Sequence, residues 1–403
     1  MSRVAISGIG AVSAAGIGAE ALWQLAVSGK SAVRAHDFPG NEILSVGIFG
    51  AFADFDPSED EDAAILKRCD RYSQFAHLAA REAVTQSGID PELLRGPRTA
   101  VFIGSGIGGM TTLDAGYNQL NSGRRFMDPL SVPKLIPSSA TAHVSIQYGA
   151  QGPSFAVCSA CSSASQSIGL AMMLIRAGVV DRAIAGGSEA CLTVPTIRAW
   201  ELLRVLSPDG CKPFSNNRNG TVLGEGAGVV LLESEASLAA RGGAPIGWLN
   251  GYATTSDARD MLQPDVDGAA AAMQGALDDA GLSADDIDYI NAHGTGTVLN
   301  DVNEATAIRR VFGDATDSLL VSSSKSQTGH LLGASGGIEL AITLAAARAQ
   351  IVPPHINCAE PDPKCEITLA ADIPTNRPIR YALSNSFAFG GMNASLILAA
   401  PEV

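Results

Sequence analysis

The segment 155–169, with the sequence FAVCSACSSASQSIG, decides how the chain is interpreted. Apolar residues lead to Cys161, and a run of small residues follows it. Aliphatic residues then continue to Ile175, and no Asp, Glu, Lys or Arg occurs between Leu135 and Arg176. This composition predicts a strand-like approach followed by a helix that is buried on all sides.

Cys161 lies where that helix is expected to begin. Unpaired backbone N–H groups and the positive end of the helix dipole lie there. Such a setting lowers the pKa of a thiol below its usual value of about 8.5, and makes a thiolate available for attack. On the local sequence alone, a buried cysteine that acts as a small hydrophobe is an equally good interpretation.

Cys158 and Cys161 also match the C-x-x-C spacing of redox proteins. Redox motifs of this kind lie near the start of short domains, and no second pair with zinc-type spacing is present. The redox interpretation is therefore the weaker one. Cys158 is expected to pack in the strand that leads to Cys161.

Two of the six histidines occupy unusual settings. His293 belongs to the loop 291–297 (NAHGTGT), which follows a short apolar strand, and His330 ends the segment 322–330 (SSSKSQTGH). A second buried helix that begins with small residues, 331–346, is expected directly after His330. Two histidines at strand ends, together with a poised thiol, predict a reaction centre.

Taken in order, these motifs resemble the β-ketoacyl-acyl-carrier-protein synthases, the decarboxylating condensing enzymes of the thiolase superfamily. The similarity is greatest to the elongating, synthase II-like branch and extends over essentially the whole chain. Further segments carry it, namely 4–12 (VAISGIGAV), 104–109 (GSGIGG), 185–190 (AGGSEA), 212–214 (KPF), 224–228 (GEGAG) and 384–394 (SNSFAFGGMNA).

The resemblance implies an α/β fold, a thiolase-like five-layer α-β-α-β-α sandwich of two similar halves. Residues 1–245 would carry the nucleophilic cysteine, and residues 246–403 the two histidines. A homodimer is implied, in which the strand before Cys161 pairs across the two-fold axis. A heterodimer remains possible.

The implied reaction is a decarboxylative Claisen condensation. Cys161 would hold an acyl group, and a malonyl group on an acyl carrier protein would lose carbon dioxide to give an enolate. His293 and His330 would stabilise the enolate oxygen through their Nε2–H groups, which is an electrostatic role rather than that of a simple base. The product is a 3-oxoacyl-acyl-carrier-protein.

Further roles follow from the same resemblance. Lys325 and Glu339 would pair and orient His330, since a buried lysine without a partner is costly. The N–H groups of Cys161 and Phe389 would hold the tetrahedral oxyanion. Gly390 and Gly391 would let the backbone approach this oxyanion closely. Thr295 and Thr297 would bind the pantetheine arm. The acyl pocket would run beside Ile107 and reach Ser131 of the partner subunit.

The implied partner is an acyl carrier protein, which is normally acidic, whereas this chain has a formal charge of −14. Docking therefore needs local positive charge, and three clusters around one entrance are expected to supply it: Lys67 with Arg68, Arg124 with Arg125, and Arg204. No metal and no organic cofactor are expected, because the substrates carry their phosphopantetheine on the carrier protein. No nucleic-acid partner is expected.

Composition agrees with one large folded unit. Hydrophobic residues make up 46% of the 403 residues and charged residues 17%, which implies a large buried core. Prolines, glycines and serines within 135–175 argue against a membrane span. Seven cysteines without a recognisable secretory signal predict a reducing, cytoplasmic location.

Three alternatives were compared with the condensing enzyme. A thiolase would need a second catalytic cysteine, and the contexts of Cys358 and Cys365 do not fit. A non-catalytic, chain-length-factor-like subunit would lack the nucleophile, whereas Cys161 is retained. A Cys-His hydrolase lacks a water-activating role for the second histidine. Departures from the family pattern, such as Met392 in place of a common Thr, leave open a specialised pathway such as nodulation-factor, polyene or very-long-chain acyl synthesis.

Overall fold

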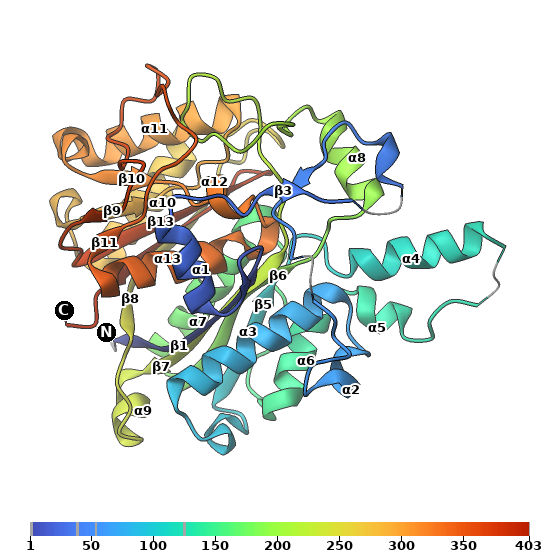
Figure 1. Ribbon diagram of the computed structural model, residues 1–403. Coiled ribbons are helices and arrows are strands. Elements are labelled where there is room, and N and C mark those ends of the chain that lie inside the picture. Colours follow the sequence, from blue (N-terminus) through green and yellow to red (C-terminus); the bar gives the residue numbers. More distant parts are fainter. Residues whose placement is uncertain (1–2, 38–39, 53–54, 124–125, 403) are drawn as a thin grey trace.

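The computed structural model describes residues 3–37, 40–52, 55–123 and 126–402. Ten strands of this part form one mixed sheet in the order β10-β9-β13-β14-β8-β1-β7-β6-β5, with β2 paired to β1 (Figure 1). These strands are β1 (Val4–Ser13), β2 (Gly16–Ile17), β5 (Thr99–Gly104), β6 (Arg182–Glu189), β7 (Gly226–Ser234), β8 (Gly247–Ser256), β9 (Tyr289–Asn291), β10 (Leu320–Ser322), β13 (Tyr381–Ala388) and β14 (Met392–Ala399).

The sheet consists of two similar parts that meet where β1 pairs with β8, at Val4 opposite Leu249. In each part, antiparallel strands lie next to this joint and a parallel pair lies farther out, β5 with β6 in one part and β9 with β13 in the other. Strands β1, β7 and β14 are almost entirely buried, so they are nearly continuous runs of apolar and small residues.

Helices on both sides of the strands complete five layers. Helix α3 packs on β1 and β7, and α10 packs on β8 and β14, as the two outer layers. Between the two parts of the sheet, α7 and α13 contact each other and strands of both halves. The predicted α-β-α-β-α sandwich is thus confirmed. The four helices named here, together with α6 and α11, have these bounds: α3 (Arg71–Ser87), α6 (Ser139–Tyr148), α7 (Ser163–Arg176), α10 (Val266–Ala280), α11 (Val298–Phe312) and α13 (Ser335–Ala349).

The two central helices begin in the same way. A 3-10 turn, Ala160–Ser162, precedes α7, and another, Leu332–Ala334, precedes α13. The first residue of each turn has a left-handed backbone, with φ of 48° at Ala160 and 46° at Leu332. The repetition of so unusual a conformation shows that the two halves share one local design.

The approach to Cys161 corrects one prediction. Residues 153–157 run beside β5 and make hydrogen bonds such as Phe155 N to Val101 O at 3.3 Å, but only an isolated bridge forms there, not a strand. Helix α7 is also not buried on all sides, because Met173 is 57% exposed. Phe155 is likewise 48% exposed, so neither the segment nor this face of the helix is fully covered by the described residues.

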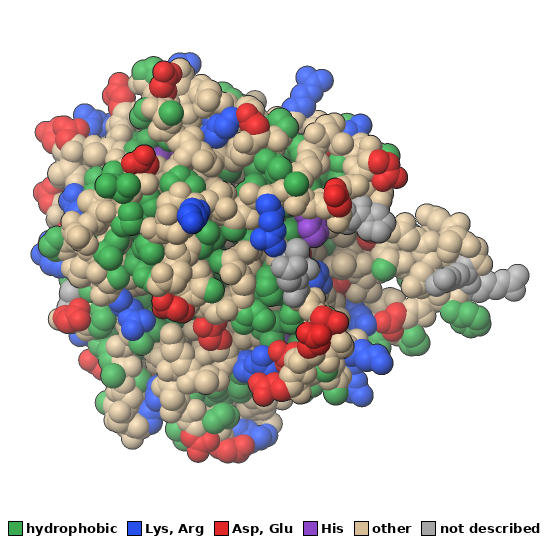
Figure 2. Space-filling model, in the orientation of Figure 1, with side chains coloured by type: hydrophobic (Ala, Val, Ile, Leu, Met, Phe, Trp, Pro, Cys, Tyr) green, Lys and Arg blue, Asp and Glu red, His purple; other side chains and the backbone are tan. Residues whose placement is uncertain are grey.

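Helices α4 (Met110–Asn121) and α5 (Ser131–Leu135) stand away from the body as an arm (Figures 1 and 2). The remaining elements are α1 (Ala19–Val27), α2 (Ala63–Leu66), α8 (Val194–Leu202), α9 (Glu235–Ala240), α12 (Lys325–Thr328), and the two small sheets β3 (Arg34–Ala35) with β4 (Ile48–Phe49) and β11 (Ile351–Val352) with β12 (Thr375–Asn376). Within the described ranges, no helix has the length and apolar character needed to cross a membrane.

Candidate active site

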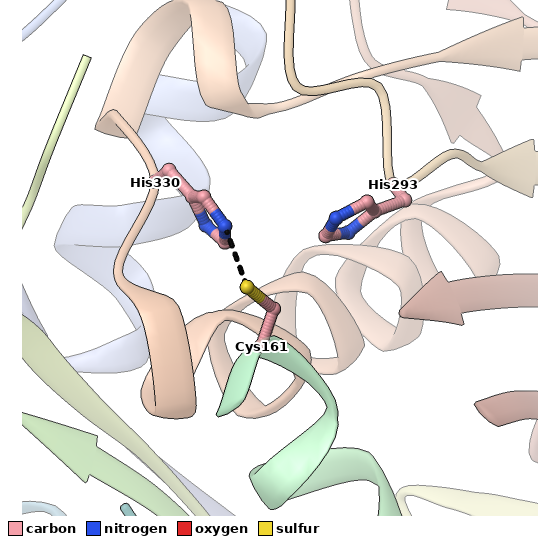
Figure 3. Close-up of side chains that lie close together, drawn as sticks. All are labelled: Cys161, His293 and His330. Carbon is pink, nitrogen blue, oxygen red and sulfur yellow. Dashed lines mark hydrogen bonds between the residues drawn. The ribbon is translucent and has the colours of Figure 1, made fainter. Parts of the chain in front are cut away.

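Cys161, His293 and His330 meet at the junction of the two halves (Figure 3). The Nε2 atom of His330 lies 3.1 Å from Sγ of Cys161, and the two imidazole rings are edge to face with centroids 5.4 Å apart. All three side chains are at least 95% buried. The structure therefore brings together the three residues that the sequence singled out.

The turn before α7 holds the cysteine. Cys161 is the middle residue of this turn, one position before the helix cap, as predicted. The hydroxyl of Ser163 accepts a hydrogen bond from Ser159 N at 3.0 Å and donates to Ala160 O at 2.7 Å. These bonds fix the turn on both sides of the nucleophile.

His293 follows β9 in a loop that a buried carboxylate holds in place. Glu304 accepts hydrogen bonds from His293 N at 2.8 Å and Gly294 N at 2.7 Å. The sequence analysis missed Glu304. Its signal was an acidic residue on the apolar face of α11, at helical spacing from Asp301 and Ile308.

Lys325 and Glu339 form the expected buried ion pair, but it serves the other histidine. Nζ of Lys325 donates to His293 O at 2.5 Å and lies 3.4 Å from His293 Nδ1. The prediction that the pair orients His330 was wrong. Lys325 starts the short helix α12, from which its side chain extends under the His293 loop.

His330 is oriented by a serine instead. Its Nδ1 atom lies 2.8 Å from Oγ of Ser335, the first residue of α13, and this oxygen also accepts a hydrogen bond from Leu331 N at 3.0 Å. Nothing in the sequence marked Ser335, because it lies in a run of small residues that is typical of a buried helix start.

The predicted lowering of the Cys161 pKa is not found. Burial raises the pKa of the Cys161 thiol to about 12, and the nearby Lys325 only partly opposes this, while Glu189 and Glu339 raise it further. The physical reason is that the free energy needed to remove a thiolate from water is larger than the stabilisation that the positive charge of Lys325 provides. At neutral pH the resting cysteine is a thiol.

Both imidazoles are neutral for the same reason. Burial, and then the positive charge of Lys325, lower the pKa of His293 and that of His330 well below the usual value. A neutral imidazole carries one ring proton, so it can donate one hydrogen bond without bringing a charge into the site.

A cavity of about 310 Å³ opens from these three residues toward the surface. Five of the other predicted residues line it: Thr295, Thr297, Arg204, Phe389 and Gly391. Trp200, which the sequence analysis did not select, stacks on Phe389 with ring centroids 5.5 Å apart. Most of the remaining wall is apolar and comes from both halves, including Leu203, Met261, Leu262, Val298, Leu299 and Phe387.

The glycine pair shapes one side of this cavity. Gly390 and Gly391 have φ values of 80° and 69°, which favour glycine. Gly390 N donates to Met261 O at 2.8 Å, and a Cβ on Gly391 would lie 2.5 Å from that of Asp257. The loop after β13 can thus approach the site closely, as expected.

Other predicted residues lie elsewhere in this chain. Ile107 packs in the apolar cluster that contains Cys161 but does not line the cavity, and Ser131 lies on the projecting arm. Lys67 and Arg68 are exposed after α2 and are not part of the cavity wall, so their place around the entrance stays a prediction. Arg124 and Arg125 lie outside the described residues.

The other cysteines do not form a second reactive centre. Cys158 is exposed, not packed as predicted, because the approach segment leaves one side open. Burial raises the pKa of Cys365 to about 12, and neither it nor Cys358 lines the cavity. All seven cysteines are free.

Among the described residues, Cys161, His293 and His330 form the one group of three potential metal ligands, with ligand atoms within 4.8 Å of one another. A thiolate and two imidazoles are a donor set that zinc accepts. The ammonium group of Lys325, however, is 3.4 Å from the His293 ring and repels a second cation. The arrangement suits stabilisation of a negative oxygen better than metal binding.

A duplicated five-layer sandwich with a buried cysteine and two histidines at its centre defines a thiolase-fold enzyme. Residues 1–237 match the family model for the Beta-ketoacyl synthase, N-terminal domain, and residues 246–359 match that for the Beta-ketoacyl synthase, C-terminal domain. The chain belongs to the β-ketoacyl synthase family.

Relatives in two contexts are about equally similar. Nodulation protein E of Rhizobium sp. (strain N33) is 41% identical, and the match covers 98% of each chain. The 3-oxoacyl-[acyl-carrier-protein] synthase 2 of Staphylococcus aureus (strain COL) is 40% identical, over 98% of this chain and 97% of the relative.

Solved structures agree with this assignment. The ishigamide ketosynthase/chain length factor superposes with a TM-score of 0.93 at 30% identity, over 99% of both chains. A type II PKS ketosynthase, bound to the hexaketide and in complex with its acyl-carrier protein, gives a TM-score of 0.91 at 30% identity, also over 99% of both chains.

Proposed function

We propose that this chain condenses an acyl group held on Cys161 with a malonyl-acyl-carrier-protein, to give a 3-oxoacyl-acyl-carrier-protein and carbon dioxide. One observation carries the proposal. The Cys161 sulfur lies at the buried end of the cavity, 3.1 Å from an imidazole nitrogen of His330, with the His293 ring beside it. A nucleophile and two neutral donors converge there on the space that the reacting carbons would share.

In the first half-reaction the Cys161 sulfur attacks the thioester carbon of an acyl-carrier protein. A sulfur–carbon bond forms to Cys161, the bond to the carrier sulfur breaks, and the thiol proton leaves with the carrier thiol. The tetrahedral oxygen would accept hydrogen bonds from the N–H groups of Cys161 and Phe389. Because burial raises the pKa of the Cys161 thiol, its proton has to leave as the sulfur attacks, and it ends on the carrier thiol.

In the second half-reaction malonyl enters on its carrier arm, alongside Thr295 and Thr297. The bond to the carboxylate breaks, carbon dioxide leaves, and the electron pair forms an enolate whose oxygen is held by His293 and His330. The enolate carbon attacks the acyl carbon on Cys161, the bond between that carbon and the sulfur breaks, and the departing sulfur takes up a proton from solvent to restore the thiol. Two neutral donors in a dry cavity stabilise this oxygen more strongly than water does.

We propose an acyl carrier protein as the partner, with Arg204 at the mouth of the cavity as a docking contact. The similar ketosynthase that was solved with its acyl-carrier protein supports this. Lys67, Arg68, Arg124 and Arg125 remain candidates for a wider footprint. No cofactor is proposed, because the substrates bring their own phosphopantetheine.

The assembly that we propose is a homodimer through the segment before Cys161. Residues 153–157 offer an edge that no described strand covers, and exposed apolar side chains lie on this segment and on α6 and α7, which flank it in the sequence: Ile146 (77% exposed), Phe155 (48%) and Met173 (57%). Unpaired edges with apolar neighbours are typical sites of strand addition. Free thiols throughout the chain support a reducing, cytoplasmic location.

A heterodimer with a chain-length-factor-like subunit is the second candidate, favoured by the similarity to the ishigamide ketosynthase/chain length factor. The pathway, whether general fatty-acid elongation or a specialised one, stays open, because the two curated relatives are equally similar. The retained Cys161 makes this chain the catalytic member in either case.

Incubation of the purified chain with acyl-carrier and malonyl-carrier thioesters of increasing acyl length tests the proposal. Mass spectrometry of the intact protein should show an acyl adduct that Cys161→Ala lacks, and the carrier should gain a 3-oxoacyl chain. Acylation without condensation at every acyl length, with this chain alone, would favour the heterodimer. No acylation with any carrier would refute the proposed function.

A further inference from the structure

The hydroxyl of Ser335 lies between two groups of the site. It is 2.8 Å from His330 Nδ1 and 3.0 Å from Leu331 N, and the residue is 1% exposed. The hydroxyl is therefore shielded from bulk water, and the partners that satisfy it are the protein groups within reach.

The direction of each hydrogen bond follows from the partners. A backbone N–H can only donate, so Ser335 Oγ accepts from Leu331. The hydroxyl proton then needs an acceptor, and within the described residues His330 Nδ1 is the one that lies in range. Ser335 therefore donates to Nδ1, and that nitrogen carries no proton.

We propose that Ser335 is a positioning residue that holds His330 in the tautomer with its proton on Nε2. The Nε2–H group then faces the cavity, 3.1 Å from the Cys161 sulfur. This inference rests on the proposed function, because the proton on Nε2 is what the enolate oxygen would accept during condensation.

His293 reaches the same tautomer by another device. The ammonium group of Lys325 can only donate, and it lies 3.4 Å from His293 Nδ1, which therefore acts as an acceptor. Both rings thus direct Nε2–H into the cavity. A charged lysine fixes one of them, and a neutral hydroxyl fixes the other.

The equivalent serine of the first half shows what is special about Ser335. Ser163, the first residue of α7, accepts from Ser159 N at 3.0 Å just as Ser335 accepts from Leu331 N, four residues back in both cases. The Ser163 hydroxyl proton goes to Ala160 O at 2.7 Å. Of the two serines, Ser335 alone donates its hydroxyl proton to an imidazole. Ser163→Ala therefore removes the equivalent hydrogen bond to the backbone and leaves the partners of His330 unchanged.

The test compares Ser335→Ala with the wild-type protein by two measurements. Nitrogen NMR of the ¹⁵N-histidine-labelled protein, with His330 assigned from His330→Asn, reports the tautomer. Turnover of malonyl-carrier decarboxylation and the rate of Cys161 acylation report the two half-reactions. We expect mixed tautomers at His330 and about a tenfold loss of decarboxylation turnover, with little change in KM and acylation within about twofold.

Ser163→Ala is expected to leave His330 in the single Nε2–H form, and Ser335→Cys, which keeps a weaker donor of similar size, to show an intermediate tautomer ratio. If Ser335→Ala does not fold, the Ser335→Cys comparison decides. A single Nε2–H tautomer in the folded variant, or unchanged decarboxylation, would overturn the proposal. A wild-type protein that never decarboxylates malonyl-carrier would instead refute the proposed function, and the NMR result would still stand on its own.

Discussion

Cys161 and Gly333 occupy equivalent positions in two copies of one turn. Each is the middle residue of a 3-10 turn that begins with a left-handed residue and leads into a central helix. The first copy carries the nucleophile. The second has no room for a side chain, because a Cβ at Gly333 would lie 2.3 Å from Gly106 N and 2.7 Å from Glu189 Oε2.

Gly333→Ala should therefore destabilise the fold at this contact. Glu189 accepts hydrogen bonds from both Gly333 N and Gly106 N, and a methyl group would force these two backbones apart. We expect a loss of about 1–3 kcal/mol in the free energy of unfolding by urea denaturation. Gly47→Ala is the control, since nothing lies within 4 Å of its added Cβ. Equal stabilities for the two variants would contradict this account.

The two half-reactions should separate by mutation. Cys161→Ala is expected to abolish acyl transfer, because no other nucleophile lines the reacting end of the cavity. His330→Ala should still accept an acyl group on Cys161 but lose decarboxylation by about 100-fold or more, as for removal of an oxyanion donor. Intact-protein mass spectrometry and carbon dioxide release measure the two steps. A folded His330→Ala protein that cannot be acylated would mean that His330 acts as the base for the thiol.

Removing one partner of the buried Lys325–Glu339 ion pair should destabilise the protein more than replacing both partners by apolar residues. Glu339→Ala leaves the Lys325 ammonium group buried without its carboxylate, which we expect to destabilise the protein by about 3–5 kcal/mol. The double variant Lys325→Met/Glu339→Leu should be more stable than either single variant, although it loses the support under His293. Urea unfolding of the three proteins measures this. The idea fails if Glu339→Ala stays within about 1 kcal/mol of wild type.

Alkylation of Cys161 should depend steeply on pH. Burial raises the pKa of its thiol to about 12, so the thiolate fraction at neutral pH is small and grows about tenfold for each pH unit. The iodoacetamide rate at Cys161, followed by peptide mass spectrometry, should rise without a plateau from pH 7 to 10. A plateau near pH 8 would show that the helix terminus outweighs burial.

The same shift affects stability. Because the folded pKa is above the unfolded one, the contribution of Cys161 is fully present below the unfolded pKa, near 8.5. It is lost as pH rises from there toward 12. Cys161→Ala should therefore flatten the fall in stability on the alkaline side.

Charge reversal at the cavity mouth should affect the carrier and not the chemistry. Arg204→Glu is expected to raise KM for carrier-linked substrates several-fold, and most at low salt, while sparing acylation by a small N-acetylcysteamine thioester. Lys67→Glu/Arg68→Glu tests in the same way whether the docking footprint extends beyond the cavity wall. Equal losses with both thioesters would place Arg204 in the chemistry or the fold.

The sequence was sufficient for the residues whose chemistry is rare in a core. Cys161, His293 and His330 stood out because a thiol and imidazoles at the ends of apolar segments need an explanation. Lys325 and Glu339 were paired correctly, since buried charges need partners, but the histidine that they serve depends on where the fold places Lys325 relative to the loop after β9. That placement is a tertiary relationship which no local pattern encodes.

The role of Ser335 and the direction of the Cys161 pKa shift were not predicted from the sequence, for different reasons. Ser335 is one small residue among many at a helix start, and its role depends on a hydroxyl proton whose destination only the folded geometry determines. The pKa prediction considered the helix terminus and left out burial. Burial is a property of the whole sandwich, and here it outweighs the local field.

The open edge at the approach segment 153–157 has a consequence for how activity depends on assembly. The nucleophile lies only four residues beyond an open edge of the sheet, so whatever covers that edge also steadies the turn that carries Cys161. Under the proposed dimer, dissociation would impair catalysis before either chain unfolds. Specific activity would then fall on dilution while the circular dichroism spectrum stayed unchanged, and the protein concentration itself would set how much of the enzyme is active.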